Sequence, residues 1–212
     1  MGELVKDGRL GACIDVGMML SRILEQEGFW NYIVKGSLTI TFPRGRKLPR
    51  QYYWSWDVVE KPFGAAHAWV VAPPFSIIDI SIKQQRHKKT VGHQLLPDMV
   101  VTEDVTTSAP DPADLFSPSF LNINRILPAK AIMIVDPRLT QFFQKFSPVT
   151  TIINEVELKY TRVAVTAPDL PFPQMTGWAM NGRIGIEVYT QLIHPHMEAY
   201  RQNREGHEPC SP

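Results

Sequence analysis

An amphipathic helix that carries a cysteine near its start is the feature that most constrains the fold of this chain. Within residues 11–28 the apolar side chains recur with the i, i+3, i+4, i+7 spacing of one helix face. They are Cys13, Val16, Met19, Leu20, Ile23 and Leu24. Gly28 follows, and glycine readily adopts the left-handed conformation that ends a helix. The pattern therefore predicts one helix whose apolar stripe packs on a core and begins at Cys13.

The position of Cys13 allows chemistry as well as packing. The first helical turn carries partial positive charge from unpaired N–H groups and the macrodipole, which favours a thiolate over a thiol. A cysteine on an apolar helix face is more commonly a small buried hydrophobic residue, so a chemical role requires partner residues elsewhere. The other cysteine is Cys210. We expect free thiols, because nothing in the composition indicates an oxidising compartment.

Two short β-type segments, residues 65–71 and 76–82, flank a Pro-Pro turn and predict an antiparallel hairpin. If Pro73 is the centre of a three-residue loop, His67 lies directly opposite Asp79. Opposed residues have Cβ atoms about 4.5–5.5 Å apart, within reach of an imidazole–carboxylate hydrogen bond. Asp79 also interrupts an isoleucine-rich strand, and a carboxylate buried there needs a partner. We therefore expect His67 and Asp79 to pair.

Together, Cys13, His67 and Asp79 are the parts of a thiol acyl-transfer site. Cys13 would attack a carbonyl carbon and His67 would accept and return the proton. Asp79 would orient the imidazole and stabilise its charged form. The backbone N–H of Cys13, at a helix N-terminus, would donate to the oxyanion.

These elements, a cysteine on a helix followed by His-Ala-Trp-Val and Ile-Ile-Asp-Ile-Ser, resemble the transglutaminase-like branch of the papain-type cysteine protease superfamily. The resemblance covers roughly residues 11–82. It implies an α+β fold in which the nucleophile helix packs on an antiparallel β-sheet. It also implies Cys13 as nucleophile, His67 as base and Asp79 as the orienting residue.

One part of the family's site has no evident counterpart in this sequence. Members usually carry a helical segment before the nucleophile helix, with a glutamine or aromatic donor on the oxyanion side. Only twelve residues precede Cys13 here. The candidates for a second donor are Trp30, Trp54 and Trp56.

The remainder of the chain is expected to be an extension of the catalytic core. We place the core at residues 1–96 and the extension at residues 97–212. Four prolines within residues 97–118 indicate a long connection. Alternating apolar residues at 156–165 and 183–189 predict a β-rich C-terminal extension that packs on the core.

The net charge and a few local patterns indicate which partners, location and cofactors to expect. The 212 residues carry a formal net charge of +1, which gives no electrostatic basis for binding nucleic acid or an anionic membrane. The basic residues of 43–50 are expected to lie on a solvated hairpin tip. Residues 1–7 lack the apolar core of a signal peptide, so a cytoplasmic location is expected. We expect no cofactor, because nothing resembles a Walker loop or a dinucleotide turn. We also expect no metal: His194-Pro195-His196, with His207 and Cys210, offers zinc-ligand residue types, but the pair lacks a partner at fixed spacing.

The leading functional hypothesis is a thiol-dependent peptidase, amidase or transglutaminase. It would act on a glutamine or other amide carbonyl of a peptide or protein through a thioester. A second hypothesis is an arylamine N-acetyltransferase-like enzyme using acetyl-coenzyme A, since residues 10–15 loosely resemble the cysteine surround of those enzymes. A third is a catalytically dead transglutaminase-like scaffold that binds a protein partner.

Overall fold

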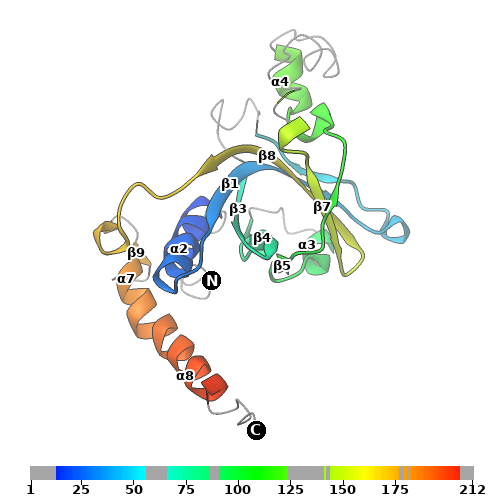
Figure 1. Cartoon of the computed structure of the whole chain (residues 1–212). Coiled ribbons are helices and arrows are strands. Elements are labelled where there is room, and N and C mark those ends of the chain that lie inside the picture. Colours follow the sequence, from blue (N-terminus) through cyan, green and yellow to red (C-terminus); the bar gives the residue numbers. More distant parts are fainter. Residues whose placement is uncertain are drawn as a thin grey trace. The chain divides into compact units, whose positions relative to one another are not determined.

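The computed structural model (Figure 1) groups the chain into two compact units, one within Leu10–Ala167 and the other including Pro168–Pro212. The residues that it describes are 13–55, 66–85, 91–123, 141, 144–176, 179–180 and 182–205. None of the helices described in these ranges reaches the length and apolarity that crossing a membrane requires.

The larger unit is built on one curled antiparallel sheet (Figure 1). Its described strands are β1 (Tyr32–Thr41), β2 (Gln51–Tyr53), β3 (His67–Ala72), β4 (Phe75–Asp79), β5 (Val100–Thr102), β6 (Thr106–Thr107), β7 (Val149–Ile153) and β8 (Val156–Thr166). The strand order is β5-β4-β3-β1-β8-β7-β6, and β2 also pairs with β1. Strand β1 is therefore central, with β8 on one side and both β3 and β2 on the other.

Helix α2 (Cys13–Gln26) covers one face of β3 and β1. Gly28 has φ +83°, and the N–H groups of Gly28 and Phe29 bond to the carbonyls of Glu25 and Leu24. This is the Schellman arrangement predicted for the helix end. Gly17 faces Ile33 and Ala68, so the helix lies close to the sheet. The predicted helix is confirmed, including its glycine stop.

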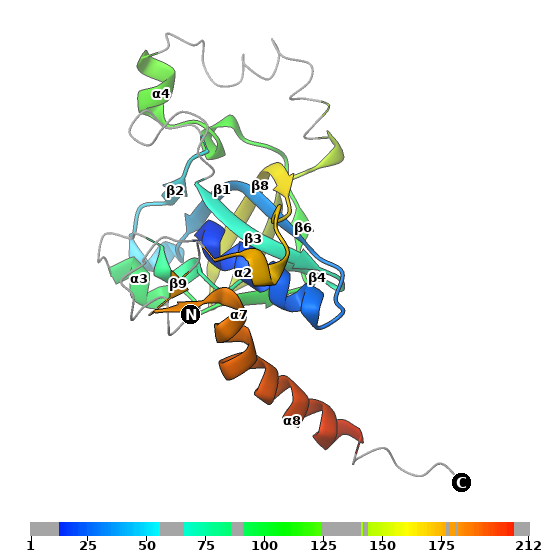
Figure 2. The same cartoon turned by 90° about the vertical axis from the view of Figure 1, so that its left-hand side faces the viewer.

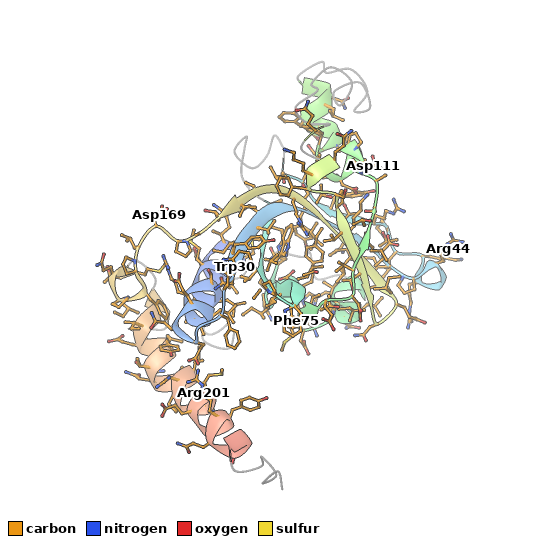
Figure 3. The ribbon with its side chains drawn as sticks, viewed as in Figure 1. Trp30, Arg44, Phe75, Asp111, Asp169 and Arg201 are labelled. Carbon is orange, nitrogen blue, oxygen red and sulfur yellow. The ribbon has the colours of Figure 1, made fainter. Side chains whose placement is uncertain are left out.

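The opposite face of the sheet carries the larger apolar cluster, which includes Trp69, Leu38 and Tyr160. Short helices complete the unit (Figure 2). They are η1 (Arg44–Arg46), η2 (Ile82–Gln84), α3 (Val91–Leu95), η3 (Pro112–Asp114) and α4 (Pro118–Ile123). Arg44 is exposed at the tip of the β1–β2 hairpin and points away from the sheet (Figure 3).

The structure agrees with the expected α+β class and with a helix on an antiparallel sheet, but it organises the chain differently from the expected halves. Strand β8, from the second half, pairs with β1 along most of its length. The larger unit consequently runs to Ala167, whereas the expected boundary lay between residues 96 and 97. Pairing between strands distant in sequence leaves no local signal, which is why the proline-rich segment suggested an earlier boundary.

The described part of the smaller unit is mainly helical. It holds η4 (Phe172–Gln174), β9 (Ala179–Met180), β10 (Arg183–Ile184), α7 (Gly185–Val188), the π-helix η5 (Tyr189–Ile193) and α8 (His194–Glu205). The predicted strand at 183–189 is wrong beyond Ile184. The Glu187 carboxylate accepts a hydrogen bond from the Ile184 N–H, and this contact starts a helix where alternation had suggested a strand.

Candidate active site

His67 lies where β1 changes partner. Strand β3 pairs with β1 up to Gly36, which is opposite His67, and β2 pairs with β1 from Leu38 onward. A Cβ on Gly36 would lie 2.0 Å from the carbonyl oxygen of Thr161. Glycine is therefore required there, next to the bulge in the β1–β8 pairing. This close approach places the His67 ring among side chains from β2, β3 and β8.

His67 and Asp79 form the pair that the sequence predicted. His67 Nε2 lies 2.6 Å from Asp79 Oδ2, and both side chains are fully buried. In this structure Nε2 of the imidazole is engaged by the carboxylate, which leaves Nδ1 as the nitrogen available for proton transfer.

The register that suggested this pair is wrong in detail. The strands are joined by the two-residue turn Pro73-Pro74, whose peptide bond is cis. Val70 pairs with Ile78, and the register shifts between Val70 and Ala72. Extending the Val70–Ile78 register sets Trp69 opposite Asp79, so His67 is its diagonal neighbour. The displacement is two residues, and because side chains alternate with period two, His67 and Asp79 still share a face.

Both oxygens of the Asp79 carboxylate accept hydrogen bonds. Its Oδ1 accepts bonds of 3.0 Å from both the N–H and the hydroxyl of Ser81, and its Oδ2 accepts a 3.0 Å bond from the Tyr160 hydroxyl beside that of His67. Burial alone would raise the pKa of this carboxyl group. The charge and hydrogen bond of His67, with the bonds from Ser81 and Tyr160, outweigh burial and hold the pKa below its usual value. Asp79 is therefore a carboxylate at neutral pH.

The imidazole of His67 is correspondingly charged. Burial lowers its pKa, but the Asp79 carboxylate and then the Cys13 side chain raise it, to a net value of about 10. Among the described residues, Nδ1 has no hydrogen-bond partner of standard geometry. The site thus holds an imidazolium whose Nε2 bonds to Asp79, while its Nδ1 is not hydrogen-bonded within the described part of the chain.

Cys13 is the first residue of α2 and is 4% exposed, packed with Ile33, Ala68 and Val70. Its side chain is close enough to His67 to raise the pKa of the imidazole. Burial, and then the charge of Cys13, raise the pKa of Tyr53. The structure therefore brings all three predicted site residues together from α2, β3 and β4.

Three aromatic rings surround the imidazole. The ring centroids of Tyr53, Trp69 and Tyr160 lie 6.4, 6.2 and 6.1 Å from that of His67. Sequence reasoning missed Tyr160 and Ser81 as parts of the site. Alternation placed Tyr160 on a strand, but nothing local indicated that this strand lies beside β1. Ser81 follows Asp79 by two residues, a spacing that permits a turn-like bond to the carboxylate.

The structure describes two of the three tryptophans that were proposed as oxyanion donors. Trp30 is 70% exposed and follows the C-terminal end of α2, about 20 Å of helix away from Cys13. The Trp54 indole N–H donates to the carbonyl of Ala113 at 2.9 Å and is thereby occupied. Trp56 lies outside the described residues. Trp30 and Trp54 are thus not positioned to bind an oxyanion at Cys13 in this structure.

Among the described residues, the remaining polar candidates do not come together in a second site. His194 and His196 lie on α8, while His207 and Cys210 fall outside the described residues. Within the described ranges, no three metal-ligating side chains come together. Comparison of the chain with family models, with curated proteins and with solved structures gives no match.

Proposed function

We propose that the protein is a thiol-dependent acyl-transfer enzyme, with Cys13 as nucleophile, His67 as proton carrier and Asp79 as the orienting carboxylate. The single observation that carries the proposal is the arrangement of His67. Its Nε2 is held by Asp79 at 2.6 Å, and its uncommitted Nδ1 is the nitrogen left for exchange with the thiol. A purely structural buried histidine would be expected to have both nitrogens bonded.

The reaction would begin from a Cys13 thiolate beside the His67 imidazolium, whose Nδ1 carries the proton that the thiol has given up. The thiolate sulfur then bonds to an amide carbonyl carbon, and the carbonyl π electrons move to the oxygen. When the C–N bond breaks, its electron pair leaves with the nitrogen, which takes the proton from Nδ1. The thioester is released by water or by an amine, which returns a proton through His67. A glutamine side chain or peptide bond would serve as the acyl donor.

The burial of the site favours one alternative, a scaffold that binds a partner without catalysis. Cys13 is almost completely buried, and His67 and Asp79 have no exposed surface. A thiol that no substrate can reach would react slowly with any reagent. Reactivity of Cys13 therefore separates an enzyme from a scaffold.

The decisive experiment measures the rate of Cys13 alkylation by iodoacetamide between pH 5 and 9, with Cys210→Ser in every variant. In the enzyme, Cys13 reacts at pH 6–7, below the range in which free thiols with a pKa of about 8.5 react. His67→Ala is expected to lower the rate at pH 7 by at least about 100-fold. His194→Ala, which removes a histidine from the smaller unit, is the matched control and should leave the rate unchanged.

An alkylation rate that is negligible at every pH in folded protein would favour the scaffold. A rate that is equal in wild type and His67→Ala would refute the proposed site. If the expected pattern is found, glutamine peptides with an amine acceptor, followed by release of ammonia, give the first substrate test.

A further inference from the structure

Tyr160 connects the candidate site to the second half of the sheet. It lies in β8 opposite Leu38 of β1, and its side chain is fully buried in the cluster that contains Trp69. Its hydroxyl donates to Asp79 Oδ2 at 3.0 Å. The same oxygen accepts the 2.6 Å hydrogen bond from His67. Tyr160 therefore acts on the oxygen that orients the imidazole.

The hydroxyl is a permanent donor. Burial, and then the neighbouring Asp79 carboxylate, raise the pKa of Tyr160 well above its ordinary value. It therefore stays protonated across the range in which acyl transfer would operate. A hydrogen bond donated to a carboxylate stabilises the charged form and opposes its protonation. With Ser81 on Oδ1 and Tyr160 on Oδ2, the carboxylate is held from both oxygens.

We propose that Tyr160 is a positioning residue of this site, whose hydroxyl keeps Asp79 ionised and turned toward His67. The inference deepens the proposed acyl-transfer function and rests on it for its significance. Tyr160 touches neither the thiol nor a substrate and acts through Asp79. Its role is to extend to lower pH the range in which the histidine retains its counter-charge.

Apart from Asp79 itself, the titratable groups of the site come from four elements. His67 of β3 and Tyr160 of β8 bond directly to Asp79. Cys13 of α2 interacts with the imidazole, and the ring centroid of Tyr53 of β2 lies 6.4 Å from that of His67. Tyr53→Phe is therefore a matched control, because it removes a hydroxyl from another ring beside His67 while Asp79 keeps its bonds to Tyr160 and Ser81.

The test is Tyr160→Phe in the full chain. Phenylalanine keeps the ring that packs against His67 and Trp69 and removes only the hydroxyl. The readout is the His67 ring signal of histidine-labelled protein by NMR between pH 2.5 and 7, with circular dichroism to verify folding. The low-pH midpoint, at which Asp79 takes up a proton, is expected to rise by about one pH unit. Tyr53→Phe should leave this midpoint in place.

A second measurement separates positioning from packing. Tyr160→Phe is expected to lower Cys13 alkylation at pH 5 and to have no further effect in an Asp79→Asn background. An effect of the same size in both backgrounds overturns the inference, as does an unchanged NMR midpoint. The proposed function fails by a different result, namely equal alkylation in wild type and His67→Ala. The NMR midpoint still decides the effect of Tyr160 on Asp79 in that case.

Discussion

Two buried carboxylates, Asp79 and Asp114, bind strand β8 from opposite faces of the sheet. Asp79 bonds to Tyr160, and Asp114 bonds to Lys159, its neighbour in β8. Because successive side chains of a strand point to opposite faces, the two acids bind β8 from its two sides. Their partners differ. Asp114 accepts a 2.7 Å bond from the Thr39 hydroxyl and pairs at 2.7 Å with Lys159, whereas Asp79 holds a histidine.

Under the proposed function, the difference distinguishes a structural ion pair from a pair that takes part in the reaction. The Lys159 ammonium has only donor protons and, with its bond to the Ala109 carbonyl, ties η3 and the segment before it to β8. The imidazole has two nitrogens, so binding one to Asp79 leaves the other for the proton exchange with Cys13 that we propose. A buried acid is therefore not by itself a sign of catalysis. A buried acid indicates catalysis only if its hydrogen-bond partner has a second functional atom that is directed at a nucleophile.

The largest expected effect comes from substituting each acid in turn, because Asp79 is expected to control Cys13 alkylation and Asp114 to control stability. Asp79→Asn should lower Cys13 alkylation at pH 7 by at least about 100-fold, because the imidazolium loses its counter-charge. Asp114→Asn should leave alkylation of folded protein unchanged and lower the free energy of unfolding by about 1–3 kcal/mol, since it weakens a buried ion pair. Denaturant titration and alkylation of the same samples test both. Loss of alkylation in Asp114→Asn would remove the distinction between the two clusters.

The pH dependence of stability gives a second expected contrast. The pKa of His67 is about 10 in the folded protein, against about 6.5 in an unfolded chain. The stability that this raised pKa contributes is complete below pH 6.5 and is lost as the pH rises through 10. The Tm difference between wild type and Asp79→Asn should therefore be largest near pH 7 and shrink toward pH 10.

Asp114→Asn is the control for that measurement. It retains the His67–Asp79 pair, so its Tm should decline over pH 7–10 as that of wild type does. If the Tm difference between wild type and Asp79→Asn stays constant across this range, His67 is not held as an imidazolium by Asp79.

The first half of the chain was largely predictable because its signals are local. Helical spacing around Cys13, the glycine at 28 and the hairpin around Pro73-Pro74 located three site residues on their elements. The predicted turn length was wrong, yet His67 and Asp79 form the predicted pair. A register error of two residues leaves a side chain on the same face of the strand, whereas an error of one residue would have placed His67 and Asp79 on opposite faces.

What the sequence could not indicate depends on pairing across the fold. Residues 156–165 were predicted to form a strand and do so, as β8, but their place beside β1 follows from long-range packing. The hydrogen bond from Tyr160 to Asp79 follows from the same placement. The larger unit runs to Ala167, because β8, which was assigned to the extension, pairs with β1 and supplies the hydroxyl that bonds to Asp79.

The smallest effect is expected from Ser81→Ala, which belongs to a matched pair of hydroxyl deletions on the two acids. Ser81→Ala removes one donor from Asp79 Oδ1, but the Ser81 N–H still bonds to that oxygen. Thr39→Val removes the hydroxyl that bonds to Asp114 Oδ1. We expect a loss of about 0.5–1 kcal/mol for Ser81→Ala and about 1.5–3 kcal/mol for Thr39→Val, because a buried carboxylate oxygen without a donor is costly. Ser81→Ala should also move the low-pH midpoint of His67 less than Tyr160→Phe, since Oδ2 keeps both donors. The reverse order would mean that Ser81, rather than Tyr160, holds the carboxylate in place.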